Sequence, residues 1–122
     1  TKVEFDTQVF DVGGVFDPAT YRFTCATAGK YYIYTSMYLD GAASASLQDA
    51  GSAIWLNGAH EARGLMNCDG NRIQASSITV TQMIDLSVSD YIEVYAYVNQ
   101  SGGTATLRGS SNLAIFGGWL VV

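Results

Sequence analysis

Hydrophobic and polar residues alternate along most of this chain with a period of two. That period is typical of a β-strand, whose successive side chains point to opposite faces of a sheet. Runs of β-branched and aromatic residues are bounded by Gly, Asn, Asp or Ser, as strands are bounded by turns. The runs predict strands over residues 3–10, 14–17, 21–27, 30–39, 52–57, 76–86, 91–99, 104–108 and 113–122. We therefore expect an all-β antiparallel sandwich or jelly roll.

Three of the predicted strands have no polar face. In residues 31–39 the alternation separates Tyr31, Ile33, Thr35, Met37 and Leu39 from a second, tyrosine-rich face. Residues 91–98 repeat this arrangement, and the closing run LAIFGGWLVV is apolar almost throughout. An antiparallel sheet in a sandwich normally presents one face to water. No helical pattern is present to cover a second apolar face, so other copies of the chain are expected to cover it.

Two longer segments, 40–51 and 57–76, are predicted to be loops, and long loops on a rigid scaffold are where binding usually occurs. The 57–76 segment is the candidate ligand surface, with the 40–51 segment beside it. Its ligand-binding candidates are His60, Arg63 and Arg72. Trp55 alternates with its apolar neighbours, so it either projects outward, where an indole can stack on a sugar, or takes a rim or core position.

Length and charge narrow the choice of partners. A chain of 122 residues suits one domain, and its formal net charge is −5. The 6 Lys and Arg residues are scattered, so no basic stripe is available for nucleic acid. No apolar run approaches the roughly 20 residues of a membrane-spanning helix, so no membrane insertion is expected. Only 14% of the residues are charged, so uncharged polar groups and tyrosines are expected to cover much of the surface.

Candidate catalytic and metal-binding residues are few. His60 is the single histidine and no nucleophile elbow is visible, so a solvated histidine is a better interpretation than a Ser-His-Asp triad. Cys25 is expected in the core and Cys68 in a loop, both as free thiols without a catalytic role. One His and two separated Cys do not supply a zinc set. The oxygen-rich stretches 39–49 and 69–72 lack the spacing of a calcium loop, so Asp-Gly turns are expected there and calcium is a lesser alternative.

Three stretches, in chain order, resemble the signatures of one family. They are FDPATYRFTCATAGKYYIYTSM, LSVSDYIEVYAYV and the terminal FGGWLVV. Over most of its length the chain is similar to the globular head of complement component 1q, within the tumour-necrosis-factor-like (TNF-like) jelly-roll superfamily. The positions that carry the resemblance are Phe23, Thr24, Cys25, Gly29, Tyr31, Tyr32, Asp90, Phe116, Gly118, Trp119 and Leu120.

The resemblance implies an antiparallel TNF-like jelly roll that forms a tight homotrimer about a threefold axis. It also implies a non-enzymatic head on a fibrous stalk, located outside the cell or on a virion surface. Such a head recognises proteins, glycans or cell surfaces. No cofactor is expected, with calcium as the lesser alternative because some relatives hold it near the top of the trimer. If the three two-sided strands share one sheet, the trimer interface is expected at Tyr32, Tyr34, Tyr38, Tyr95, Tyr97 and Trp119.

The scarcity of lysine and the Ala-, Ser-, Thr- and Gly-rich loops favour a viral or phage fibre. Residues 1–122 would then be a single head domain, forming the C-terminal part of a longer fibrous chain. Two alternatives stay open. In one, the domain is a purely structural trimerisation cap or capsid decoration; in the other, it is a secreted, complement-like ligand-binding protein of an animal.

Overall fold

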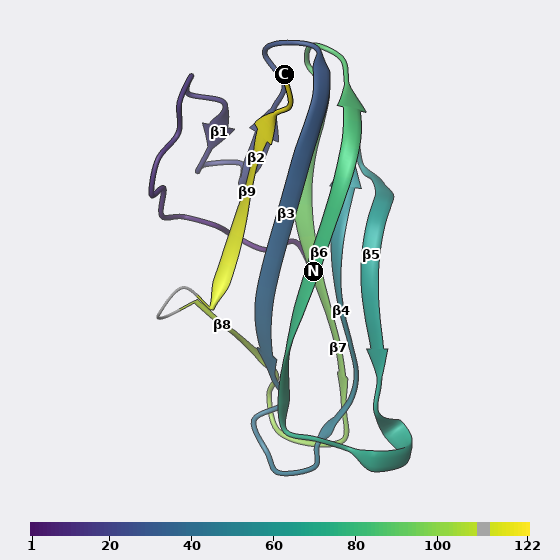
Figure 1. The fold of residues 1–122 in the computed structure, drawn as a ribbon. Helices are drawn as coiled ribbons and strands as arrows, with labels where there is room; N and C mark the ends of the chain where they lie inside the picture. The colour runs from purple at the N-terminus through teal and green to yellow at the C-terminus, as the bar shows by residue number, and fades with distance from the viewer. Residues whose placement is uncertain (110–112) are drawn as a thin grey trace.

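The computed structural model describes residues 1–109 and 113–122. Within them, long strands run side by side along the length of the molecule in two layers (Figure 1). The elements are β1 (Phe16–Asp17), β2 (Arg22–Thr24), β3 (Gly29–Asp40), β4 (Leu47–Leu56), β5 (Ala59–Asn67), the short 3₁₀ helix η1 (Asp69–Asn71), β6 (Ala75–Leu86), β7 (Tyr91–Gln100), β8 (Thr106–Arg108) and β9 (Ala114–Leu120). These elements confirm the predicted all-β antiparallel sandwich.

The two layers are antiparallel sheets of different composition. One has five strands in the order β1-β2-β7-β4-β5. The other has the order β6-β3-β8, and β9 also pairs with β3. Strand β3 is therefore central in the second sheet, whereas β7 and β4 are central in the first. We call these the β7–β4 sheet and the β3 sheet.

The core lies between the two sheets because their inner faces carry the larger aliphatic side chains. On β3, Ile33, Met37 and Leu39 are no more than 1% exposed, as the alternation predicts. Ile54 and Ile92 of the β7–β4 sheet are fully buried in one cluster with Ile33 and Leu39, whereas Met37 packs with Val3 and Val94. Buried and half-buried residues alternate from Tyr31 to Leu39 of β3, so the predicted division of this strand into two faces is confirmed.

The predicted strand at 3–10 does not form. Val3 donates its backbone N–H to Val94 and is buried, but the chain then leaves the sheet and runs without a strand until β1. Asp11 explains the interruption, since its carboxylate accepts the backbone N–H groups of Val15 and Phe16 at 3.2 and 3.0 Å. An Asp that satisfies nearby amides in this way favours a turn over a strand.

The predicted loop at 57–76 is wrong for most of its length. Residues 47–56 and 59–67 instead form the β4–β5 hairpin, so the predicted 40–51 loop is also shorter than expected. Asn57 and Gly58 join the two strands with φ angles of 50° and 82°. Two central residues with positive φ make the two-residue turn that matches strand twist, and Asn-Gly is its strongest sequence signal. Asn57-Gly58 is therefore a hairpin turn and not the start of a long loop.

Glu93 is a buried carboxylate on the outer side of β7, and two cations neutralise it. It is 4% exposed; Lys2 Nζ lies 2.6 Å and Arg22 Nη2 2.9 Å from its Oε1 atom. Burial alone would raise the pKa of Glu93, but the hydrogen bonds and charges of Lys2 and Arg22 outweigh it and lower that pKa. This group therefore ties residues 1–3 and β2 to the β7–β4 sheet.

We expect the domain to lose stability as the pH falls below about 4. The pKa of Glu93 is lowered, and hydrogen bonds also lower the pKa values of Asp17 (from Ala19), Asp40 (from Ala42), Asp69 (from Arg72) and Asp90 (from Asn57). A lowered pKa in the folded state stabilises the fold above the pKa of the unfolded chain, and this stability disappears as pH falls through the folded value. Urea unfolding at neutral and acidic pH measures the effect. Equal free energies of unfolding on both sides of this range would contradict the role of these carboxylates.

Candidate functional site

The outer face of the β3 sheet carries a cluster of aromatic side chains, which we call the β3–β9 aromatic face. The ring of Trp119, on β9, lies 4.7 Å from that of Tyr32 and 6.2 Å from that of Tyr34, both on β3. Met83 of β6 lies opposite Tyr32 in the register, and Ile115 of β9 lies opposite Ser36. Trp119, Met83 and Ile115 are 55%, 49% and 39% exposed. Three neighbouring strands thus present one apolar surface to solvent.

Charged groups flank this face at both ends of β3. At one end Lys30 pairs with Asp85 at 3.4 Å. At the other, Arg108 binds Asp40 at 2.7 Å and lies over the ring of Tyr38 at 5.8 Å. An apolar centre with a polar rim is the composition of a protein–protein interface core.

Tyr95 and Tyr97 do not belong to this surface. They lie on β7, in the other sheet, so the condition that the three two-sided strands share one sheet is not met. β3 and β9 do share a sheet, and Tyr32, Tyr34, Tyr38 and Trp119 share its outer face. Alternation gives the face of a strand but not the sheet to which the strand belongs.

The outer face of the β7–β4 sheet is hollowed where its central strand carries small residues. Gly51 and Ala53 of β4 form the floor of this outer-sheet hollow, which has a volume of about 360 Å³. The register places Ala53 between Tyr95 of β7 and Arg63 of β5. It also places Gly51 between Tyr97 and Leu65 on the same two strands, and both these side chains line the hollow.

Trp55 closes one end of the hollow within a stack of rings. Its ring is stacked on Tyr95 at 4.1 Å and lies 4.5 Å from the ring of His60. Trp55 is thus half-buried on the outer face, so of the positions left open for it the structure excludes the core. His60 packs on Trp55 and belongs to this stack.

A β-bulge brings His60 and Arg63 to the same face. Residues three apart in a regular strand point to opposite faces. Here the register shifts between Ile54 and Trp55, whose partners are Ala62 and His60, so Glu61 is the extra residue. Bulges re-aim side chains in this way, and both His60 and Arg63 line the hollow. Two of the three predicted ligand-binding residues therefore lie together, although on a strand and not on a loop.

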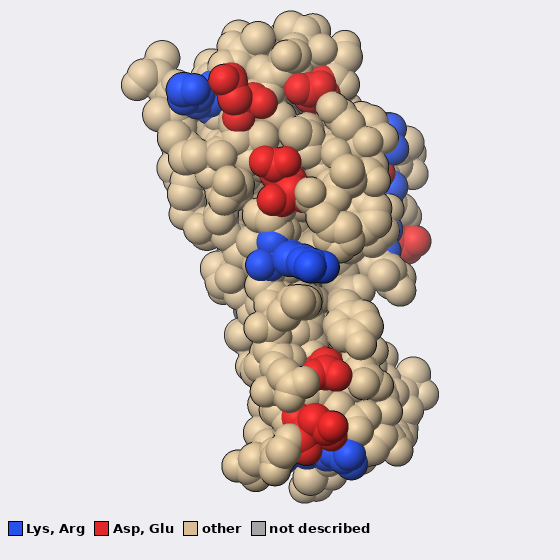
Figure 2. Space-filling model, turned by 90° about the vertical axis from the view of Figure 1, so that its right-hand side faces the viewer, with Lys and Arg blue, Asp and Glu red and all other residues tan. Residues whose placement is uncertain are grey.

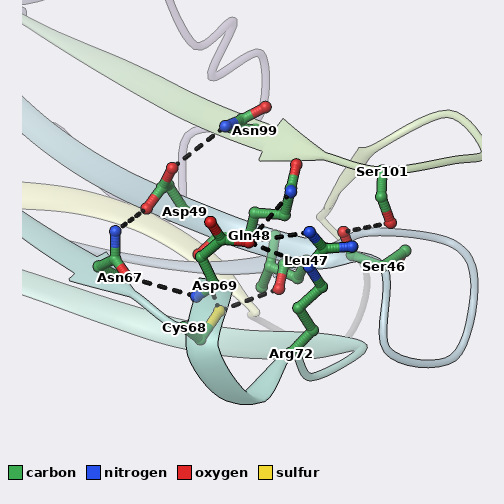
Figure 3. A network of polar contacts seen from close by, with 10 residues as sticks. All are labelled: Ser46, Leu47, Gln48, Asp49, Asn67, Cys68, Asp69, Arg72, Asn99 and Ser101. Atoms are coloured by element: carbon green, nitrogen blue, oxygen red, sulfur yellow. Dashed lines mark hydrogen bonds and ion pairs between the residues drawn. The ribbon is translucent and has the colours of Figure 1, made fainter.

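Arg72, the third predicted residue, lies at the opposite end of β5 in a polar network (Figure 3). Arg72 donates two hydrogen bonds to Asp69, which also accepts one from Gln48. These bonds from Arg72 and Gln48 lower the pKa of Asp69. In the same network Asp49 accepts from Asn67 and Asn99. The polar groups of this end bind one another, so Arg72 is already paired in the isolated domain.

Both cysteines are free thiols. Cys25 is buried in the core, as expected, and its Sγ lies 3.2 Å from the backbone oxygen of Thr27. Cys68 is half-buried beside the polar network of Asp49, Asp69 and Arg72, with its Sγ 3.0 Å from the backbone oxygen of Leu47 (Figure 3). Each thiol therefore packs against a backbone carbonyl.

The described part of the chain has no feature typical of a metal site or a membrane-spanning helix. Its described residues contain no group of three or more His, Cys, Asp or Glu arranged to hold a metal ion. Residues 1–109 and 113–122 include no helix that is long and apolar enough to cross a membrane. Figure 2 shows the charges of one side of the molecule as small, separate groups of both signs among uncharged atoms. This side carries no basic stripe that could follow a nucleic-acid backbone.

Two antiparallel sheets in this order, closed by a C-terminal strand that pairs with β3, form the framework seen above. The family model of the C1q domain matches residues 1–121, nearly the whole chain. The chain belongs to the C1q domain family. A comparison with curated protein sequences finds no relative that matches it.

Membership of the C1q domain family bears on the expected fold, activity, assembly and location. C1q domains are non-enzymatic binding modules with the TNF-like jelly-roll fold, so the expectation of a binding domain and not an enzyme is confirmed. They typically form homotrimers, and the proteins that carry them are usually secreted or extracellular. This C1q domain carries two surfaces of different character, the β3–β9 aromatic face on one sheet and the outer-sheet hollow on the other.

Proposed function

We propose that this C1q domain is the trimeric head of a longer surface or virion fibre and recognises a receptor or glycan on a cell surface. The β3–β9 aromatic face carries the proposal. An exposed Trp119 beside Tyr32 and Tyr34 is costly for a monomer, since aromatic rings gain most when they are removed from water. Burial of this face against two other copies leaves the hollow of the opposite sheet open in each subunit.

A second apolar feature supports assembly. The segment between Val3 and β1 stands away from the sandwich on the side of β9 (Figure 1). Three of its apolar residues, Val9, Phe10 and Val12, are 85%, 81% and 91% exposed. Neighbouring apolar side chains this exposed mark an interaction surface. In the proposed trimer, this segment packs on the neighbouring subunit, next to Tyr32, Tyr34, Tyr38 and Trp119.

In the proposed mechanism, one sheet serves assembly and the other serves binding. The β3 sheet holds the subunits together, while the other sheet and the loops present three copies of one weak site. Three linked sites on one fibre raise the apparent affinity for a repetitive surface without any new contact in the site itself. Surfaces with many identical copies of a ligand, such as glycan-covered cells, are the targets that such a head suits.

Binding of the labelled domain to a printed array of cell-surface glycans and glycoproteins tests this function. We expect saturable binding that unlabelled domain competes away. The same chain held as a monomer by Trp119→Glu should bind much more weakly, because it loses avidity. A trimer that binds nothing on glycan arrays or on intact cells would contradict recognition.

A structural cap is the second candidate function. The polar network of Asp49, Asp69 and Arg72 favours it. The side chains of this end bind one another, which suits a rigid closure of a fibre more than an adaptable binding loop. A cap should trimerise and raise the melting temperature of an attached stalk. Its loss would dissociate the fibre, whereas loss of a recognition head would leave the fibre intact but unable to attach.

A further inference from the structure

Among the Lys and Arg side chains of the described residues, one has no counter-charge. In residues 1–109 and 113–122, Arg63 is the Lys or Arg side chain that forms no ion pair with a carboxylate. The other five Lys and Arg side chains are all paired: Lys2 and Arg22 with Glu93, Lys30 with Asp85, Arg72 with Asp69, and Arg108 with Asp40. In a domain with a net charge of −5, a cation left without a partner at a concave surface indicates an anionic ligand.

The hollow beside Arg63 is formed by the size of the residues on its floor. A Cβ at Gly51 would lie 2.7 Å from Leu65 Cδ2 and 3.7 Å from Tyr97 Cβ. Any side chain there would fill the space between these two walls. Ala53, the next outward residue of β4, is only 8% exposed because Tyr95 and Arg63 stand on either side of it. The hollow therefore depends on two small residues between larger ones.

The lining of the hollow combines flat aromatic surface with positive charge. Tyr97, which is 54% exposed, and the stacked pair Tyr95 and Trp55 supply ring surface. No Asp or Glu lines the hollow. Of the acidic residues beside it, Glu93 opposite Trp55 binds Lys2 and Arg22. Asp49, two residues before Gly51 on β4, accepts hydrogen bonds from Asn67 and Asn99. A guanidinium binds a carboxylate through two parallel hydrogen bonds, and an aromatic ring packs on the apolar face of a sugar.

We propose that the outer-sheet hollow binds a carboxylated sugar residue of a surface glycan, with Arg63 on the carboxylate and Tyr97 against the ring. The volume of about 360 Å³ is in the range of small-ligand sites and holds a single sugar. The hollow lies on the sheet opposite to the β3–β9 aromatic face, so it stays open in the trimer. This inference rests on the proposed recognition function and specifies its ligand class.

Matched sugars test the charge requirement on the wild-type domain. Methyl glucuronoside and methyl glucoside share a ring and differ in the carboxylate, and the methyl glycoside of N-acetylneuraminic acid is a second acidic probe. Titration followed by NMR of isotope-labelled domain should show an acidic sugar binding at least about tenfold more tightly than the glucoside, since a charge-assisted hydrogen bond is lost. Equal binding of acidic and neutral sugars, or binding of neither acidic sugar, would overturn the proposal.

Two variants and a control locate the site. Arg63→Gln should weaken binding of the acidic sugar by about tenfold or more, and Ala53→Val should weaken it by filling the floor while Arg63 is unchanged. Arg72→Gln makes the same chemical change outside the hollow and should bind like wild type. Loss of binding in Arg72→Gln but not in Arg63→Gln would place the site elsewhere. If the trimer binds only neutral glycans on the array, this inference fails while the recognition function stands.

Discussion

Trp119→Glu should convert the trimer of this domain into monomers, whereas Tyr97→Glu should leave it trimeric. The two side chains are equally exposed in the isolated chain, at 55% and 54%, but they lie on opposite sheets. Trp119 is central to the β3–β9 aromatic face, so a carboxylate there would be buried without a partner in the trimer. Such a charge costs about 3–5 kcal/mol, which predicts a weakening of the trimer by more than about a hundredfold.

Light scattering after size exclusion measures this effect, and circular dichroism checks that both variants stay folded. The pair separates two accounts of the aromatic residues. If the trimer used Tyr95 and Tyr97, as the sequence suggested, Tyr97→Glu would dissociate it. Dissociation by Tyr97→Glu with an intact Trp119→Glu trimer would place the interface on the β7–β4 sheet and leave no open hollow.

The second large effect is expected at Gly118, where β9 approaches β3. A Cβ at this position would lie 2.7 Å from the backbone oxygen of Tyr32 and 2.6 Å from Ile33 Cδ1. Because the backbone atom cannot move without disturbing the strand pair, Gly118→Ala should destabilise the domain by about 2–3 kcal/mol. Gly118→Val should cost more, and domains of this size have a total stability of only about 5–15 kcal/mol.

Gly102→Ala is the matched control, because no heavy atom lies within 4 Å of a Cβ built at that glycine. Its free energy of unfolding should differ from wild type by less than about 0.5 kcal/mol. Urea unfolding of the wild type, Gly118→Ala and Gly102→Ala gives the comparison. A Gly118→Ala domain as stable as the Gly102→Ala domain would show that β9 can move away from β3, and the β3–β9 aromatic face would then not be a fixed surface.

The strands of the β3 sheet were the most predictable part of the fold. The predicted ranges 30–39 and 76–86 differ from β3 and β6 by one residue at each affected end. Burial alternates from Tyr31 to Leu39 of β3 and, apart from Gln82, over residues 77–86 of β6. The two strands are paired along their whole length, so local pattern and tertiary structure agree. The resemblance to the complement component 1q head narrowed the expected sandwich to a TNF-like jelly roll and the expected self-association to a homotrimer.

The failures have particular physical causes. The run at 3–10 alternates like a strand, but the carboxylate of Asp11 holds the following backbone in a turn. The 57–76 segment contains polar residues on a strand with one exposed face, which composition alone does not distinguish from a loop. Strand β7 pairs with β4, which is distant in the sequence, and so lies in the other sheet. The alternation within β7 does not show which strand it pairs with, so Tyr95 and Tyr97 were assigned to the wrong sheet.

The candidate site was only half visible in the sequence. His60 and Arg63 could be named because of their chemistry, but their common face depends on a bulge at Glu61 that breaks the alternation. Gly51 and Ala53 form the floor of the hollow through the absence of a larger side chain, so nothing in their chemistry marked them. The sequence left an outward position and a rim or core position open for Trp55, and the structure places it half-buried on the outer face.

Fold alone does not distinguish recognition from capping, but both accounts require that the β3–β9 aromatic face is covered by copies of this chain. Sedimentation equilibrium of the unmodified domain over a wide dilution range tests that claim most directly. The account predicts a single species of three times the 13.1 kDa chain mass, stable on dilution. A species of 13.1 kDa at all concentrations would contradict it, because the aromatic face would then be exposed or covered by a different protein.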